Sequence, residues 1–313
     1  MNQELKILVI RFSSIGDIVL TSPVVRLLNS SKKYNIHFLT KEENYSLVSE
    51  NINIKKIHLL EKSLKKIFLK LRSENFDYVV DLHNNIRSNI LTFLLFKKTF
   101  KLKKFFFKKK NKLHIVDRYL LSLKKLNIVN DNLGLDFYLS KESEIKFDLY
   151  ENFISWCIGS KHYNKKLGAD KILEVCNSTD HPIVFMGGSE DIKIADWIIK
   201  KSKNKRIKNL CGSINIQQSA VIIKKSKLLL SNDTGFMHIG ASFKIPIISF
   251  WGCTKPELGF TPYQTNNHSI YIVSKEYEDS CHRYGKKCRS EVNCINKIST
   301  KEIKQAIKLI FCK

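Results

Sequence analysis

Short and almost continuously apolar runs alternate along the chain with longer stretches in which apolar positions recur at helical spacing. Residues 6–12 (KILVIRF) are a run of the first kind, typical of a strand that is buried on both faces of a parallel sheet. A turn (SSIGD) and a helical stretch at about residues 18–29 follow this run. The alternation predicts repeated strand–helix units, which is the pattern of a doubly wound α/β fold.

The pattern occurs twice, and a polar, weakly patterned stretch at residues 139–152 separates the two halves. We therefore predict two α/β domains, residues 1–150 and 151–313, with ligands bound in a cleft at the carboxyl ends of their strands. The last helix, at about residues 300–311, is a candidate to pack back on the first domain. The other predicted strands are 36–39, 56–60, 78–82, 153–158, 182–186, 207–210, 227–231 and 246–250, and the other helices are 62–74, 85–96, 169–177, 190–202, 215–225 and 234–242.

Length and composition agree with a folded two-domain protein. A chain of 313 residues can bury a sizeable core without disulfides or metals, and 43% hydrophobic residues exclude a disordered polycation. No apolar run reaches the roughly 18 residues of a transmembrane helix. The first residues (MNQELKILVI) place an acid before the apolar run and lack a cleavage site, so we expect a strand there rather than a signal peptide. A cytoplasmic location follows as the expectation, with the eight cysteines as thiols.

The chain is strongly basic, with 54 Lys and Arg against 29 Asp and Glu and a formal net charge of +25. Such a charge favours polyanionic partners: nucleic acid, an anionic membrane surface or phosphorylated substrates. Only eight of the basic residues are Arg, however, and Lys, Ile and Asn are abundant throughout, as an AT-rich coding bias would produce. Part of the excess therefore needs no function, because scattered Lys on solvated faces is ordinary.

The loop Ser13-Ser14-Ile15-Gly16-Asp17 joins the first predicted strand to the first helix. Gly16 permits a tight turn and a close approach by a ligand. Asp17 is either a helix cap or a general base that faces the cleft. The glycine spacing is not G-x-G-x-x-G, so the loop gives little support for a dinucleotide site.

Two later loops also follow predicted strands. In Ser231–His238 (SNDTGFMH) a helix begins at about residue 234, and its free backbone amides can bind an anion, with Asp233 and Thr234 as caps or ligands. His238 lies one turn further on, as a packed side chain or a catalyst. The loop at residues 159–168 offers lysines that can neutralise a phosphate.

Three segments together resemble glycosyltransferase family 9, the ADP-heptose:lipopolysaccharide heptosyltransferase family: KILVIRFSSIGDIVLTSPVVRLL, YVVDLHNNIRS and SNDTGFMHIGASFKIPIISFWGCTKP. They follow the order of the family and cover both halves of the chain. The resemblance implies a GT-B fold, in which two Rossmann-like domains face a central cleft, the first binding the acceptor and the second the nucleotide-sugar donor. It also implies an inverting transfer of heptose from ADP-heptose to the lipopolysaccharide inner core, at the cytoplasmic face of the inner membrane.

The resemblance also assigns residues by position. Asp17 matches the family's catalytic base. Lys165 matches a Lys that contacts the donor phosphates, but Leu167 and Gly168 stand where the family has Trp-Pro, so Lys161 and Lys166 remain alternatives. No metal is expected, because a Lys and a helix N-terminus can stabilise the leaving diphosphate. The implied donor-binding residues are Ser160, Lys165, Glu190, Asp233, Thr234, Gly235 and His238, and the implied acceptor-binding residues are Ser14, Gly16, His83 and Arg87.

Residues 97–113 (KKTFKLKKFFFKKKNKL) hold nine Lys, four Phe and no acid. The segment from Lys97 to Lys112 could bind an anionic membrane surface or acceptor phosphates. It could instead be a strand and loop with Phe toward the core and Lys toward water, or a site for single-stranded nucleic acid. The resemblance favours the first interpretation, with an anionic glycolipid as acceptor and no nucleic-acid partner.

Cys281, Cys288 and Cys294 have C-x6-C-x5-C spacing, which differs from the C-x2-C pairs of zinc ribbons. We expect packed or surface thiols there, with a metal site as the alternative.

Two other functions remain open from the sequence. One is transfer of another sugar, from a different nucleotide or to a different glycan. The other is a non-enzymatic basic protein that binds membranes or nucleic acid.

Overall fold

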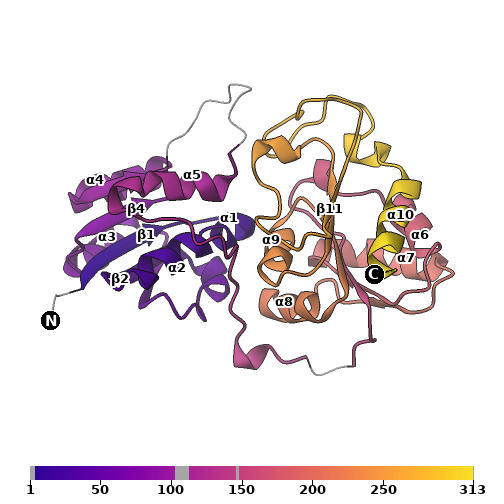
Figure 1. The fold of residues 1–313 in the computed structure, drawn as a ribbon, viewed down its shortest axis with the longest axis horizontal. Coiled ribbons are helices and arrows are strands. Elements are labelled where there is room, and N and C mark those ends of the chain that lie inside the picture. Colours follow the sequence, from indigo (N-terminus) through magenta and orange to yellow (C-terminus); the bar gives the residue numbers. More distant parts are fainter. Residues whose placement is uncertain (1–3, 103–112, 146–147, 313) are drawn as a thin grey trace. The chain divides into compact units, whose positions relative to one another are not determined.

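The computed structural model describes residues 4–102, 113–145 and 148–312, in two compact units, residues 1–140 and 141–313 (Figure 1). The division lies ten residues before the boundary predicted at residue 150 and falls within the polar stretch 139–152. Each unit has its own sheet, in which every strand pairing is parallel. The prediction of parallel-sheet α/β domains is therefore confirmed.

The first unit contains a five-stranded sheet in the order β3-β2-β1-β4-β5. Its central strand β1 has no exposed side-chain area from Ile7 to Ile10, because helices cover both faces of the sheet. The strands are β1 (Leu5–Ile10), β2 (Tyr34–Lys41), β3 (Lys56–Leu60), β4 (Tyr78–Asp81) and β5 (Lys98–Lys101), and the α-helices are α1 (Ile15–Val19), α2 (Ser22–Ser30), α3 (Leu64–Ser73), α4 (Ile86–Leu95) and α5 (Ile115–Ser122).

The second unit contains a six-stranded sheet in the order β11-β10-β9-β6-β7-β8, with β6 and β9 at its centre. The strands are β6 (Ile154–Cys157), β7 (Ile183–Met186), β8 (Ile207–Asn209), β9 (Leu228–Asn232), β10 (Ile247–Trp251) and β11 (Ile270–Val273), and the α-helices are α6 (Ala169–Cys176), α7 (Ile192–Lys201), α8 (Ile216–Lys225), α9 (Gly235–Ser242) and α10 (Thr300–Phe311).

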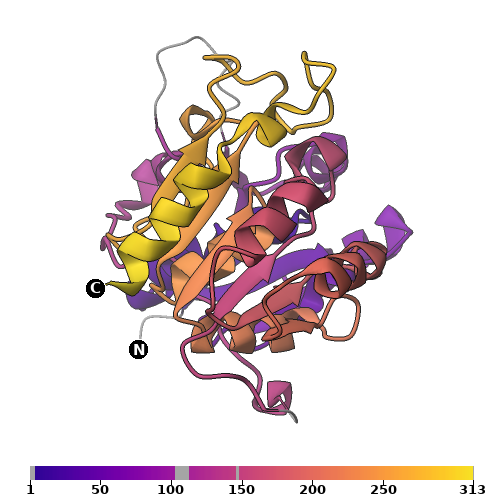
Figure 2. The same ribbon diagram turned by 90° about the vertical axis from the view of Figure 1, so that its right-hand side faces the viewer.

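The C-terminal helix belongs to the core of the second unit. Its buried residues Ile303, Ile307 and Ile310 join one apolar cluster with α6, α7 and the facing strands. Figure 2 shows α10, in yellow, on the same face of the sheet as α6 and α7. The apolar stripe of α10 is thus covered by the sheet of its own unit, whereas the expectation from the sequence placed this helix against the first unit. α9 packs on the other face, where Gly240 lies against Leu229 of β9.

Most predicted elements are present, with differences where other signals dominate the sequence. The predicted helix 18–29 is divided at Leu20 and Thr21 into α1 and α2, and Pro23 is tolerated because it lies in the first turn of α2. The helix α5 and the strand β11 were not predicted, and β5 was expected only as one interpretation of residues 97–113. Among the described residues, no helix has the length and apolarity needed to cross a membrane.

The Lys- and Phe-rich stretch is only partly described, since residues 103–112 lie outside the described residues. In β5, Phe100 is buried while Lys98 and Lys101 are exposed. For this short part, the strand interpretation with Phe toward the core and Lys toward water is correct.

Two histidines on neighbouring strands are buried together in the first unit. His37 Nδ1 lies 3.0 Å from His58 Nε2, and both rings pack edge-on against Phe76. Burial, together with the positive charge that His37 and Lys56 place nearby, lowers the pKa of His58 from 6.5 to about 4, although Glu74 opposes this effect. His58 is therefore neutral in the folded protein at neutral pH.

We predict that His58 makes the protein less stable as the pH falls. The unfolded chain binds a proton at His58 below pH 6.5, whereas the folded chain binds it only near pH 4. Stability is therefore lost as the pH falls through this window, by about 1 kcal/mol between pH 7 and pH 5.5. Urea unfolding at both pH values should show a smaller pH effect in His58→Gln. His268→Gln, at an exposed histidine, should behave as wild type. An equal pH effect in His58→Gln would contradict the prediction.

Candidate functional site

Both sheets have a point at which the chain changes its direction of progress across the sheet. In the first unit it lies between β1 and β4, and in the second between β6 and β9. The loops that leave the carboxyl ends of two such strands diverge to opposite faces and leave a crevice between them, where open α/β sheets bind ligands. Most of the residues that the sequence singled out lie in these loops or at the start of the helices that follow them.

Asp17 lies in the first turn of α1, directly after the loop that follows β1. Its Oδ1 atom is 2.7 Å from Nη2 of Arg11, and its Oδ2 atom accepts hydrogen bonds from the amide (3.1 Å) and hydroxyl (2.8 Å) of Ser14. Arg11 is itself fixed, because it donates to the carbonyl oxygens of Ser13 (2.9 Å) and Leu82 (2.5 Å). The carboxylate is therefore held in one orientation by a buried guanidinium.

These partners determine the charge of Asp17. Burial on its own would raise its pKa, but the Arg11 guanidinium and the hydrogen bonds from Ser14 outweigh burial and hold the pKa below its usual value. The side chain nevertheless keeps 23% of its surface exposed. Asp17 is thus an ionised carboxylate that an incoming hydroxyl group can reach.

The predicted acceptor-side residues lie around the same switch point. Ser14 is exposed and contacts Asp17, and Gly16 is buried within α1. His83 follows β4, and its ring packs at 4.8 Å from that of Phe12. Arg87 is exposed in the first turn of α4.

In the second unit, Lys165 reaches across the switch point between β6 and β9. Its Nζ atom lies 2.6 Å from Oδ2 of Asp233, which directly follows β9. Both side chains are mostly shielded, at 15% and 12% exposure. Of the three lysines considered from the sequence, Lys165 is therefore the one that meets the predicted donor segment.

Asn232, the last residue of β9, joins the two central strands from within and was not singled out from the sequence. Its side-chain amide donates to the carbonyl oxygens of Ile158 (3.0 Å) and Gly159 (3.3 Å) and accepts from the amide of Leu167 (3.3 Å). Its side chain is fully buried. These bonds fix the loop that carries Lys165 relative to Asp233.

Asp191 is a second buried acid that the sequence analysis missed. Its Oδ1 atom lies 2.6 Å from Lys166 Nζ, and its Oδ2 atom accepts from the amide of Gly188 at 3.0 Å. A Cβ atom at Gly159 or Gly187 would overlap its carboxylate, so these two glycines make room for it. This ion pair holds the Lys166 side chain beside the turn that follows β7. The sequence feature that points to this acid is the pair of glycines before the turn that contains Glu190 and Asp191. The sequence analysis assigned the role to Glu190.

The remaining predicted donor residues differ in exposure. Glu190 is exposed in the turn after β7, and Lys161 is exposed in the loop after β6. Thr234 caps α9 and lies 3.2 Å from the Ser231 hydroxyl through its own hydroxyl, and Gly235 begins that helix. The side chain of His238 is only 3% exposed, which corresponds to the packed interpretation of this residue. Ser160 lies two residues before His162 in the loop after β6 and is half-buried.

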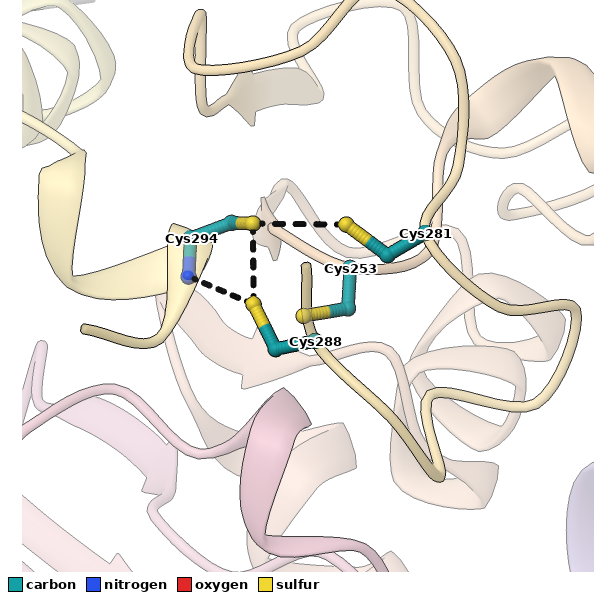
Figure 3. Close-up of side chains that lie close together, drawn as sticks. All are labelled: Cys253, Cys281, Cys288 and Cys294. Atoms are coloured by element: carbon teal, nitrogen blue, oxygen red, sulfur yellow. Dashed lines mark hydrogen bonds between the residues drawn. The ribbon is translucent and has the colours of Figure 1, made fainter. Parts of the chain in front are cut away.

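Four cysteines come together beyond the carboxyl ends of β10 and β11, and we refer to Cys253, Cys281, Cys288 and Cys294 as the cysteine cluster. Their sulfur atoms all lie within 4.8 Å of one another and are turned toward a common centre (Figure 3). The four residues are free thiols, as expected from the sequence, and they lie together in one group. Cys253 was not grouped with the others from the sequence, because 27 residues separate it from Cys281. A second group of side chains of the types that can bind a metal, His37, His58 and Glu74, lies close together in the first unit among the described residues.

The family model described as glycosyltransferase family 9 (heptosyltransferase) matches residues 64–291. The chain belongs to glycosyltransferase family 9. The resemblance inferred from the three sequence segments is thereby confirmed, and the protein is a glycosyltransferase.

Individual relatives of this family 9 protein match over its whole length. Lipopolysaccharide heptosyltransferase 1 of Campylobacter coli is 23% identical, over 98% of this chain and 99% of the relative. A glycosyl transferase family 9 structure from Veillonella parvula has a TM-score of 0.82 at 22% identity, covering 100% of this chain and 99% of that one. The ADP-heptose lps heptosyltransferase II of E. coli has a TM-score of 0.79 at 17% identity, covering 98% and 99%. These structures confirm the GT-B fold class with two Rossmann-like units.

Proposed function

We propose that this family 9 glycosyltransferase transfers a heptose from ADP-heptose to the core of lipopolysaccharide with inversion, and that Asp17 is the general base. The observation that carries the proposal is the ionised, partly exposed carboxylate of Asp17, fixed at the switch point of the first unit by Arg11 and Ser14. The relatives support the substrates, since they are described as lipopolysaccharide and ADP-heptose heptosyltransferases.

In this mechanism an acceptor hydroxyl attacks the anomeric carbon of the donor from the face opposite the diphosphate. Asp17 accepts the hydroxyl proton as the new glycosidic bond forms. A lowered pKa makes Asp17 a weak base, but it keeps the carboxylate ionised at neutral pH. The fixed orientation of the carboxylate compensates for its weak basicity, because a positioned base avoids the entropy cost of bringing the reacting groups together.

The departing nucleoside diphosphate requires positive charge in the second unit. Lys165 provides a cation, and the amides at the start of α9, behind Thr234 and Gly235, provide hydrogen-bond donors along the helix dipole. In the structure Asp233 pairs with Lys165, so a diphosphate would compete with this carboxylate for the same ammonium group. Charge from Lys165 and the helix would then stabilise the leaving group.

Asp17→Asn should lower turnover by about 10²–10⁴-fold, because the amide cannot accept the hydroxyl proton. Donor binding, measured by the thermal shift with ADP, should be unchanged. Ser14→Ala serves as the matched control, since it removes a bond to Asp17 but leaves the carboxylate and Arg11 in place. Wild-type turnover in Asp17→Asn would remove this residue from the proposed role.

Lys165→Met should weaken ADP-heptose binding by about tenfold or more, because a charge-assisted hydrogen bond to the diphosphate is lost. Lys161→Met, at an exposed lysine of the same loop, should bind as wild type. Isothermal titration with ADP-heptose, UDP-sugars and GDP-sugars measures both effects. Equal binding by the two variants, or preference for a UDP- or GDP-sugar, would contradict the donor assignment.

We also propose that α4 brings the enzyme to an anionic membrane, where a lipopolysaccharide acceptor would lie. Ile86, Ile90 and Phe93 recur at helical spacing on this helix and are 79%, 42% and 78% exposed, and Phe96 at its end is 91% exposed. The exposed lysines of β5 follow directly in the chain. Exposed apolar side chains beside basic ones favour an anionic bilayer surface.

Replacing both Phe93 and Phe96 by Ser should reduce binding to vesicles of phosphatidylcholine with phosphatidylglycerol by roughly tenfold or more, since two large apolar side chains no longer enter the bilayer. Ile52→Ser is the control, because Ile52 is 82% exposed in a different part of the first unit. Co-sedimentation measures the bound fraction. The proposal fails if the double variant and wild type sediment equally.

A further inference from the structure

The cysteine cluster has the geometry of a tetrahedral metal site. Four sulfur atoms at about 2.3 Å from one ion, at tetrahedral angles, lie about 3.8 Å from each other. In the structure Cys294 Sγ lies 3.5 Å from Cys281 Sγ and 3.1 Å from Cys288 Sγ, and no pair of the four exceeds 4.8 Å. A disulfide would instead join two sulfurs at about 2.0 Å and turn them away from the rest. All four cysteines are free thiols in the structure.

The surrounding backbone is built to bring these four residues together. Cys281 donates its amide to the carbonyl oxygen of Cys253 at 2.9 Å, which joins the loop after β11 to the end of β10. A Cβ atom at Gly252 would overlap the backbone of Ile295, so the glycine lets the turn that begins at Cys294 approach Cys253. The amide of Cys294 also points at Cys288 Sγ, at 3.4 Å. Amide donors of this kind stabilise metal-bound thiolates.

The segment that carries three of the cysteines needs such a constraint. Residues 274–299 connect β11 to α10, and the only regular structure described between them is the short turn η7 (Cys294–Lys297). Irregular connections longer than about 15 residues are uncommon in compact domains. The side chains of this connection between Lys275 and Val292 are mostly polar and include no fully buried apolar residue. An apolar core therefore does not hold this part of the connection in place.

We propose that the cysteine cluster binds one thiophilic metal ion, zinc or iron, through four thiolates and so fixes the connection 274–299. A four-sulfur tetrahedral site is the environment that these two metals prefer. Binding releases the thiol protons to solvent, and a divalent ion with four thiolates carries a net charge of −2. Arg283, Lys286, Lys287 and Arg289 lie in the same loop and offset this charge. The inference replaces our expectation from the sequence that these cysteines bind no metal.

The connection also supports the lysine of the proposed donor site. Gly285 has a φ of +69°, in the left-handed region that favours glycine. It lies so close to Lys165 that a Cβ atom there would be 2.7 Å from Lys165 Cγ. The side-chain oxygen of Asn296 accepts a hydrogen bond of 2.8 Å from the backbone amide of Gly168. The metal ion would thus act as a positioning element for Lys165. This step rests on the proposed function, whereas metal binding itself does not.

Metal analysis of the untagged full-length protein tests the site directly. We expect about one zinc or iron ion per chain, bound by deprotonated thiols. A visible absorption spectrum separates the two metals, because an iron tetrathiolate is coloured and a zinc tetrathiolate is not. Cys288→Ser should retain less than about one tenth of the metal, whereas Cys288→His should retain zinc, because three cysteines and one histidine form a zinc site.

Cys312→Ser provides the matched control, since Cys312 is an exposed cysteine outside the cluster and its replacement should leave the metal content unchanged. Removing the metal with a chelator should make residues 274–293 sensitive to proteolysis and raise the KM for the donor more than it lowers kcat. Three results would overturn the metal site: no metal in protein grown with added zinc and iron, full metal content in Cys288→Ser, or disulfides among the four cysteines of the native protein. Metal binding with an unchanged KM after chelation would overturn only the positioning of Lys165.

Discussion

The order of strands in the two parallel sheets is the constraint on which the candidate residues of each unit depend. At each switch point the two central strands end side by side, yet their loops leave in opposite directions, so backbone groups in the loops lack partners from the sheet. Buried polar side chains meet this need in both units. Arg11 donates to the carbonyl oxygen of Leu82, and Asn232 bonds to Ile158, Gly159 and Leu167. The groups that hold the loops together are therefore adjacent to the groups that carry the chemistry.

This arrangement explains why the charged residues of the site are paired. A buried guanidinium such as Arg11 is costly without an anion, and Asp17 supplies one while it remains reachable from solvent. In the second unit, Lys165 is paired with Asp233 in the same way, and Lys166 is paired with Asp191. Pairing fixes each side chain in one orientation, which preorganises the crevice of its own unit before any substrate binds. It also means that a bound diphosphate has to replace an existing carboxylate partner, and this competition favours ligands with more than one negative charge.

Much of the fold followed from the sequence because parallel strands buried on both faces are nearly continuous apolar runs, as in β1, β6 and β9. The elements and residues that the sequence analysis did not identify were missed for physical reasons. β5 has a single Phe among two Lys and a Thr within a Lys-rich stretch, so the stretch carried no clear strand period and allowed several interpretations. Asp191 and Glu190 are neighbours with the same chemistry, and only the backbone of the turn determines which of them faces inward. A metal site at Cys281, Cys288 and Cys294 was only an alternative from the sequence, and Cys253 was not included. The four cysteines come from the end of β10, the connection after β11 and the turn η7, and spacing along the chain does not show that such segments meet.

Two glycines allow the close contacts that join the cysteine cluster to the loop that carries Lys165. Gly252 allows Ile295 to approach the end of β10, and Gly285 allows the connection 274–299 to lie against the aliphatic part of Lys165. A larger residue at either position would push the connection away from the sheet, and Lys165 would lose a neighbour that restricts its rotamers. Restricting a long side chain before binding reduces the entropy lost when it meets its ligand. The irregular connection 274–299 can restrict Lys165 only if the connection is itself fixed. The four convergent thiols are better suited to fix it than its polar side chains are.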